Sequence, residues 1–232
     1  KQRVREIEEN YLNRRMRHPM FAATFKDEPI HVDKVKANKT RVFCAAPMDW
    51  SIVVRKYLIS MIRVMQRNPL VFETAVGVQA QSYQWEKFYD HIVKFGEDRI
   101  IAGDYSKFDK KMCPAFIQAA FRILSTICIK AGYSSDEVNV IEGIAVDTSF
   151  PTVNFFGDIV TFHGTNPSGH PLTVIINSLV NSLYMRYAYL MLNPEEEART
   201  FKDHVALVTY GDDNIMSVSK TIDWFNHTAV QA

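Results

Sequence analysis

The sequence predicts an α+β fold, and three observations lead to that prediction. The 232 residues are 47% hydrophobic, 12% aromatic and 23% charged, which excludes a disordered or low-complexity protein and allows a sizeable buried core. Helical and strand-like patterns are mixed along the chain without the regular β-α-β order of a parallel sheet. Only three widely spaced cysteines occur, so neither a disulfide framework nor a zinc cluster is expected to replace the core.

Five segments are expected to be helical from the spacing of their apolar residues, namely residues 1–17, 50–67, 81–94, 114–131 and 171–192. Asp49 or Ser51 is expected to cap the second of these helices. Pro114 and Pro171 stand near the starts of the last two, where the fixed φ of proline and its missing N–H are tolerated. No apolar run reaches the roughly 18 residues that a membrane-spanning helix needs.

Three segments are expected to contain strands. Residues 99–104 are an apolar run that ends in an acid, as in a buried strand. Residues 150–164 alternate between apolar and polar side chains around Gly157 and Asp158, which indicates a hairpin. Residues 205–218 hold two β-rich runs that are separated by Tyr-Gly-Asp-Asp-Asn. Residues 20–45 carry a basic cluster and are expected to be irregular or extended.

The net charge of +1 conceals an asymmetry along the chain. Residues 1–67 hold 15 Lys and Arg against 7 Asp and Glu, whereas the remaining residues hold 12 against 19. A basic first part suits contact with a polyanion, and an acidic second part suits metal cations. Two ordinary solvated surfaces explain the same numbers, so charge alone does not decide between these interpretations.

Three carboxylates form the candidate chemical site, because each stands where a predicted strand ends. Asp104 ends the run at 99–104, and Asp212 and Asp213 lie between the two runs of 205–218. Adjacent acids repel each other, and a divalent cation that prefers carboxylate and phosphate oxygens offsets that repulsion. If the strands pair, two cations at this point could serve an in-line phosphoryl displacement. Ordinary turn and capping residues remain the alternative interpretation.

Four motifs in order resemble those of viral RNA-dependent RNA polymerases, and the details are most similar to the picorna-like positive-strand virus group. Residues 210–214 resemble motif C, and residues 104–109, with an Asp at each end, resemble motif A. Residues 166–178 resemble motif B, in which a Ser-Gly loop precedes a helix that carries Thr and Asn. Lys-Asp-Glu-Pro at 26–29 and Asn-Lys-Thr-Arg at 38–41 resemble motif F.

The resemblance implies a right-hand polymerase fold, with an antiparallel palm sheet backed by helices, part of the fingers and no thumb. The implied order is a fingers segment with motif F, a palm segment with motif A, a fingers insertion, and a palm segment with motifs B and C. These four segments are expected at residues 1–61, 62–112, 113–161 and 162–232.

The resemblance also assigns roles to the acids. Asp104, Asp212 and Asp213 fall on the catalytic metal ligands, with Mg²⁺ as the implied cofactor and Mn²⁺ as an alternative. Asp109 and Asn177 fall on the nucleotide-binding pair that recognises the ribose, because a carboxylate and an amide can together register a 2′-hydroxyl. From the residues alone, a helix cap at Asp109 and a satisfied buried amide at Asn177 explain both positions.

Motif B implies contacts with RNA and with the incoming nucleotide. Ser168 and Gly169 fall on the loop that touches the template, where glycine allows close approach of the backbone. Ser168 and Thr173 fall on its polar nucleotide-binding positions. His170 and Pro171 replace the small residues often found there, which predicts a stiffer loop.

Motif F implies a basic surface for the triphosphate. Lys26, Lys34, Lys39 and Arg41 fall on its basic positions, and several cations are needed to bind a triphosphate. Ile30 stands where picornaviral relatives usually carry Arg, so that contact is expected to be missing or supplied by a neighbour. A solvated surface loop is the alternative interpretation.

The implied function is template-directed RNA synthesis in viral genome replication, by transfer of nucleotides from NTPs to an RNA 3′-hydroxyl. The implied partners are an RNA template, a primer or nascent strand, NTPs, a protein primer and other viral replication proteins. The implied source is a viral polyprotein, and the implied location is the host cytoplasm at membrane-associated replication complexes. A reverse transcriptase-like polymerase and a non-catalytic RNA-binding palm fragment are the two alternatives.

Overall fold

The computed structural model describes residues 1–231, which form two compact units. Unit 1 comprises Lys1–Ile59 and Asp109–Thr173, and unit 2 comprises Ser60–Phe108 and the segment from Val174 onward. Each unit is therefore assembled from two separate stretches of the chain. The assignment of these stretches to fingers and palm stays a prediction.

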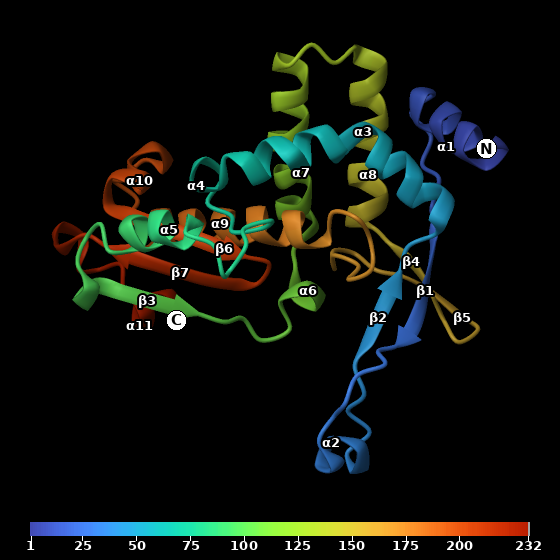
Figure 1. Ribbon diagram of the computed structural model, residues 1–232. Coiled ribbons are helices and arrows are strands. Elements are labelled where there is room, and N and C mark those ends of the chain that lie inside the picture. Colours follow the sequence, from blue (N-terminus) through green and yellow to red (C-terminus); the bar gives the residue numbers. More distant parts are fainter. Residues whose placement is uncertain (232) are drawn as a thin grey trace. The chain divides into compact units, whose positions relative to one another are not determined.

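Unit 1 is built on a four-stranded sheet in the order β2-β1-β4-β5 (Figure 1). β1 pairs antiparallel with β2 and parallel with β4, and β4 and β5 form an antiparallel hairpin. The loop of that hairpin is Phe156-Gly157, and both residues have positive φ, as a two-residue type I′ turn requires. The hairpin predicted within 150–164 is thus confirmed. The strands are β1 (Met20–Phe25), β2 (Val42–Ala45), β4 (Thr152–Phe155) and β5 (Asp158–Thr161).

The helices that lie wholly in unit 1 are α1 (Gln2–Leu12), α2 (Val32–Lys36), α7 (Pro114–Lys130) and α8 (Ser135–Ser149). α7 and α8 lie side by side as a helical hairpin (Figure 1). α7 begins at Pro114, as predicted. α8 was not predicted, although its capping box, in which Ser134 and Glu137 satisfy each other's backbone N–H groups, is visible in the sequence.

Three helices contain the points at which the chain passes from one unit to the other, namely α3 (Met48–Arg67), α6 (Phe108–Lys111) and α9 (Thr173–Leu192). The helices predicted at 50–67 and 171–192 are confirmed. The capping prediction for α3 is wrong, because the helix begins at Met48 and includes Asp49 and Ser51. The N–H of Ser51 already donates to the carbonyl of Pro47 at 2.9 Å, so helical bonding starts earlier than expected.

Unit 2 is built on an antiparallel sheet in the order β3-β7-β6. Its strands are β3 (Ile100–Gly103), β6 (Val205–Tyr210) and β7 (Asp213–Val218), which confirms the strands predicted at 99–104 and 205–218. Its shorter helices are α4 (Pro69–Phe72), α5 (Gln84–Ile92), α10 (Phe201–His204) and α11 (His227–Gln231), of which α5 was predicted.

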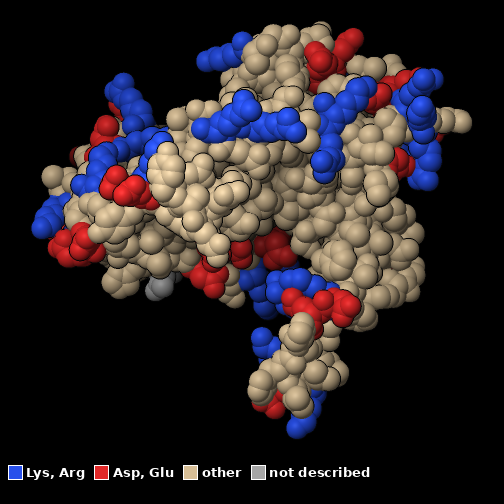
Figure 2. All heavy atoms as spheres, in the orientation of Figure 1, with Lys and Arg blue, Asp and Glu red and all other residues tan. Residues whose placement is uncertain are grey.

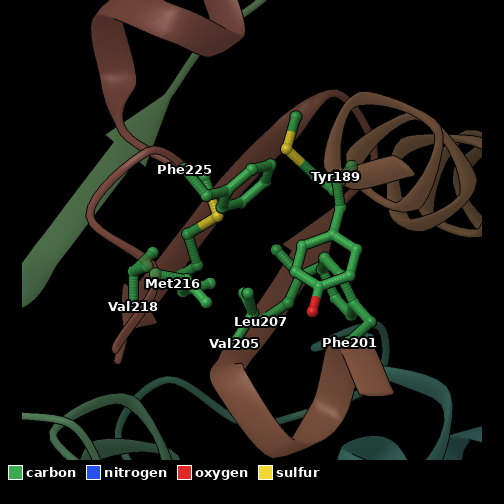
Figure 3. Packing of buried hydrophobic residues seen from close by; sticks show 9 residues of the cluster. Tyr189, Phe201, Val205, Leu207, Met216, Val218 and Phe225 are labelled. Carbon is green, nitrogen blue, oxygen red and sulfur yellow. The ribbon is translucent and has the colours of Figure 1, made fainter. Parts of the chain in front are cut away.

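A buried cluster of aromatic and aliphatic side chains holds α9 against the sheet of unit 2 (Figure 3). Tyr189 of α9 meets Phe201 edge to face, with ring centroids 5.4 Å apart. Leu207 of β6 and Met216 of β7 complete the cluster from the strands. Because side chains alternate along a strand, Asp213 lies on the opposite face from Met216. Within residues 1–231, no helix is both long and apolar enough to cross a bilayer.

Candidate active site

The three predicted carboxylates lie at one end of the unit 2 sheet. β6 and β7 are joined by the two-residue loop Gly211-Asp212, and Gly211 has a φ of 64°, which favours glycine. Asp213 is the first residue of β7 and is paired with Tyr210. On the other side of β7, Gly103 pairs with Asn214, so the next residue, Asp104, follows in register opposite Asp213. The structure therefore brings the three acids onto adjacent strand ends.

Side chains of α9 fix the backbone of this acidic hairpin. The side-chain amide of Asn181 donates to the carbonyl oxygens of Gly211, Asp212 and Asp213, at 3.2, 2.9 and 3.2 Å. The hydroxyl oxygen of Ser178 accepts from the N–H of Gly211 at 2.9 Å. The loop is therefore held from its backbone, and the carboxylates of Asp212 and Asp213 are left exposed.

Electrostatic repulsion is present among the acids. Partial burial, followed by the charges of Asp212 and Asp104, raises the pKa of Asp213 above its ordinary value. All three are exposed carboxylates, the oxygen ligands that Mg²⁺ and Mn²⁺ prefer. Within residues 1–231, no three His, Cys, Asp or Glu side chains form a ready-made metal cage. Mg²⁺ is usually held by one or two carboxylates together with substrate phosphates, so this donor set fits it without a cage.

The Ser-Gly loop of motif B lies against β2 in unit 1. The N–H of Cys44 donates to the hydroxyl of Ser168 at 3.3 Å, and the N–H of Ala46 donates to the carbonyl of Gly169 at 3.0 Å. A Cβ at Gly169 would lie 2.6 Å from the carbonyl oxygen of Cys44, so only glycine fits this approach. Thr173 closes the loop, because its hydroxyl donates to the carbonyls of Pro167 and His170, at 2.8 and 3.0 Å.

His170 anchors this loop in the interior of unit 1. Its Nε2 lies 2.7 Å from Oδ1 of Asn166, and its ring meets Trp50 edge to face. Complete burial lowers the pKa of His170 to about 3, so the ring is neutral at physiological pH. The Asn166 amide donates in turn to the carbonyl of Thr173 at 3.1 Å.

A buried network continues from Trp50. The indole N–H donates to the hydroxyl of Tyr11 at 2.8 Å, and that hydroxyl donates to Asp147 at 2.6 Å. Asp147 also accepts the backbone N–H groups of Arg17 and His18, at 3.1 and 3.2 Å. These contacts join α1, α3 and α8, and the stiffness predicted for the loop stays a prediction.

The predicted basic residues of motif F lie on the excursion between β1 and β2. Lys26 follows β1 directly and Arg41 precedes β2, and both form ion pairs with Glu28, at 2.8 and 3.4 Å. Lys34 lies in α2 and Lys39 after it, and neither has an acidic partner among the described residues. Figure 2 shows both basic and acidic atoms on the protrusion that carries α2.

The two residues expected to recognise the ribose lie in different units. Asp109 is half-buried in α6 of unit 1, and its carbonyl accepts the N–H of Asn166 at 3.1 Å. Asn177 is buried in α9 of unit 2, directly before Ser178. Their shared role stays a prediction.

Sequence reasoning missed the residues that support the site. Ser178 and Asn181 lie three residues apart on the same side of α9, among several polar residues of that helix, and that spacing was the available signal. It also missed Glu73, which is buried. The carboxylate of Glu73 accepts hydrogen bonds from Nη1 and Nη2 of Arg186, at 2.7 and 2.9 Å. The carbonyl of Glu73 accepts from the N–H of Thr209 at 2.8 Å, so this pair supports β6.

A family model described as viral RNA-dependent RNA polymerase matches residues 4–232. The chain belongs to this polymerase family. It is 31% identical to the replicase polyprotein of Cricket paralysis virus, over 98% of this chain and 13% of that protein. It is also 31% identical to the RNA1 polyprotein of Cherry rasp leaf virus, over 88% of this chain and 10% of that protein. The chain thus spans about a tenth of the length of these polyproteins.

The fold is also that of a solved polymerase. The structure of the Sicinivirus 3Dpol RNA-dependent RNA polymerase superposes with a TM-score of 0.77 at 23% sequence identity. That match covers 97% of this chain and 45% of the Sicinivirus chain. The predicted resemblance and the predicted α+β polymerase fold are therefore confirmed.

Proposed function

We propose that this chain is the catalytic part of a polymerase that copies viral RNA by transferring nucleotides from NTPs to an RNA 3′-hydroxyl. The observation that carries the proposal is the register of β3, β7 and β6. It sets Asp104 beside the Asp212-Asp213 loop in a chain of the viral polymerase family.

Asp104, Asp212 and Asp213 are proposed to hold two Mg²⁺ or Mn²⁺ ions. When bound, such ions lower the pKa of an attacking hydroxyl and stabilise the charge that develops on the transferred phosphate. Asn181 and Ser178 keep the loop carbonyls and the Gly211 N–H bonded to α9, which holds the carboxylates on the exposed side of the hairpin.

The substrate contacts are proposed as follows. Lys26, Lys34, Lys39 and Arg41 bind the triphosphate, and for two of them the phosphate competes with Glu28. Asp109 and Asn177 recognise the ribose 2′-hydroxyl, while Ser168, Gly169 and Thr173 contact nucleotide and template. The remaining partners are a primer or nascent strand, a protein primer and other viral replication proteins. Replication in the host cytoplasm at membrane-associated complexes belongs to the same proposal.

Primer extension by the complete polymerase tests the proposal. Asp212→Asn is expected to lower the rate of ribonucleotide addition by at least about 100-fold. The substitution removes one proposed ligand of the metal ions that stabilise the charge on the transferred phosphate. Asp158→Asn is the matched control, since Asp158 is an exposed acid at the start of a hairpin strand in unit 1 and is expected to leave the rate unchanged.

Two results would contradict the proposal. If Asp212→Asn extends a primer at the rate of the unsubstituted enzyme, Asp212 is not an essential metal ligand. A preference for deoxynucleotides over ribonucleotides on an RNA template would favour the reverse transcriptase alternative, and metal-independent RNA binding without any extension would favour the non-catalytic one.

A further inference from the structure

Asn214 lies next to the proposed metal ligands, but its side chain has no part in the proposed chemistry. It directly follows Asp213 in β7, and the register pairs it with Gly103, which directly precedes Asp104 in β3. Because side chains alternate along a strand, the side chain of Asn214 lies on the opposite face of the sheet from that of Asp213, toward α9. It is 6% exposed.

The amide of Asn214 has a defined orientation. Nδ2 of Asn181 donates to three loop carbonyls, so Oδ1 is the atom of that amide that accepts a hydrogen bond. Nδ2 of Asn214 donates to this Oδ1 at 3.3 Å. The other end of the Asn214 amide, its Oδ1, is buried and has no hydrogen-bond partner among the described residues.

Gly103 leaves the space that this amide occupies. A Cβ added at Gly103 would lie 2.8 Å from Oδ1 of Asn214, 3.1 Å from its Nδ2 and 3.3 Å from its Cγ. A contact of 2.8 Å is too short for a carbon atom, so an alanine at this position would displace either the amide or the strand. The amide therefore lies against the backbone of β3, one residue before Asp104.

Stability alone does not account for an asparagine at this position. A buried oxygen without a partner destabilises a fold, and an apolar side chain of the same shape would avoid that cost on a face that also carries Met216. The amide provides a connection instead. It is bonded to α9 through Asn181 and contacts β3 at Gly103, so one side chain of β7 holds both strands against the same helix.

We propose that Asn214 is a positioning residue that sets the separation between Asp104 and the Asp212-Asp213 loop, and that Gly103 provides the room for it. The inference rests on the proposed function, because these carboxylates are the proposed metal ligands. Metal-assisted phosphoryl transfer depends on where the ligands lie, and a displacement of about 1 Å can lower a rate on the order of 100-fold.

Asn214→Leu in the complete polymerase separates this role from simple packing. Leucine has nearly the shape of asparagine, and the substitution removes one unpartnered oxygen but leaves another, Oδ1 of Asn181. The melting temperature is therefore expected to change little. The rate of ribonucleotide addition is expected to fall by about 10-fold, because the side chain against Gly103 is no longer bonded to α9.

Affinity for Mn²⁺ provides a measurement that does not depend on turnover. Electron paramagnetic resonance reports free Mn²⁺ during titration of the polymerase without RNA or NTP, and Asn214→Leu is expected to weaken binding by about 10-fold.

Ser217→Ala is the matched control. Ser217 also lies in β7, is fully buried and has a side-chain oxygen without a partner in the described part of the chain. It pairs with Ile100, at the end of β3 away from Asp104, so its substitution is expected to change neither the rate nor the Mn²⁺ affinity.

Gly103→Ala tests the contact from the other strand. The added methyl group is expected to displace the amide and to lower the rate at least as much as Asn214→Ala does. Asn214→Ala removes the amide and leaves room for the methyl group, so the double variant is expected to be no slower than Asn214→Ala alone. If the losses multiply in the double variant, the two positions act independently and the proposed contact is wrong.

The remaining outcomes also decide the inference. It is overturned if Asn214→Leu has the rate of the unsubstituted polymerase, or if its rate falls while its Mn²⁺ affinity is unchanged. If Asn214→Leu melts at a much lower temperature, the rate and the Mn²⁺ affinity of Asn214→Ala decide instead. Normal extension by Asp212→Asn would refute the proposed function, whereas an inactive Asp212→Asn beside fully active variants of Asn214 would refute only the positioning role.

Discussion

At the scale of single residues, Asp213 combines an electrostatic cost with a proposed chemical role. Its pKa is raised by partial burial and by Asp212 and Asp104, so the folded hairpin is under repulsion in the absence of metal. The contacts of Asn181 and Ser178 to the loop backbone oppose that repulsion. Fold and function therefore place different demands on this side chain.

Asp213→Asn is expected to separate those demands. Without divalent metal the variant gains thermal stability, by under about 1 kcal/mol because the side chain is exposed, since one of three like charges is removed. Added Mg²⁺ or Mn²⁺ then stabilises the variant less than the unsubstituted protein. Melting temperatures with and without metal measure both effects, and a variant that melts lower in metal-free buffer would contradict the repulsion argument.

His170 predicts a pH dependence of stability. Its pKa is about 3 in the fold and near 6.5 when unfolded, so between these values the unfolded chain binds the extra proton. The contribution of neutral His170 is complete above about pH 6.5 and is lost as the pH falls towards 3, by up to about 1.4 kcal/mol per pH unit. His170→Gln lacks this loss.

Denaturant unfolding of both proteins between pH 7 and pH 4 measures the difference. Other titrating groups are shared by the two proteins and cancel in the comparison. If the free energies of unfolding of the two proteins change in parallel with pH over this range, His170 is protonated without disturbing the fold.

At the scale of elements, α9 holds the acidic hairpin by backbone contacts. Asn181→Ala removes one side chain that donates to three carbonyls, and we expect a loss of about 1–3 kcal/mol in the free energy of unfolding, together with slower nucleotide addition. Met191→Ala is the control on the same helix, since Met191 is 62% exposed. Coincident urea midpoints for Asn181→Ala and the unsubstituted protein would show that the hairpin holds itself.

The Glu73–Arg186 pair carries a second prediction at this scale. Glu73→Gln leaves the half-buried Arg186 without its carboxylate, and we expect a loss of about 3 kcal/mol. Glu73→Leu combined with Arg186→Met removes both charges and is expected to recover much of that loss. If the double variant is no more stable than Glu73→Gln, the pair stabilises the fold by more than the neutralisation of one charge by the other.

At the scale of the whole molecule, the exposed segment around α2 is expected to be the first site of proteolysis. Lys34, Lys36 and Lys39 lie in and after α2, a five-residue helix without buried side chains. Limited trypsin digestion is expected to cleave there first, because short exposed segments open most easily. Mass spectrometry of the earliest fragments measures this. First cuts after Arg63 or Lys110 would show that the interior of α3 or the α6 segment opens more easily.

Much of this architecture follows from local sequence, and the rest depends on distant contacts. The strand ends at Asp104 and Asp213 were predictable because turn residues interrupt apolar runs. The resemblance of these segments to motifs A and C implied that the two strand ends lie together. The Glu73–Arg186 pair and the Tyr11–Asp147 bond were not predictable, since they join residues 113 and 136 positions apart. The start of α3 was misjudged because Pro47, which lacks an N–H, still provides a carbonyl for Ser51.

The passage of the chain between its units has a consequence for recombination. The three passages, at 59/60, 108/109 and 173/174, fall inside α3, α6 and α9 rather than in linkers. A hybrid polymerase that takes either unit from a relative therefore needs three splice junctions, and each of them joins side chains from two parents within one helix. Exchange of genome segments between related viruses should tolerate crossovers in the β1–β2 excursion far better than at any of these helices.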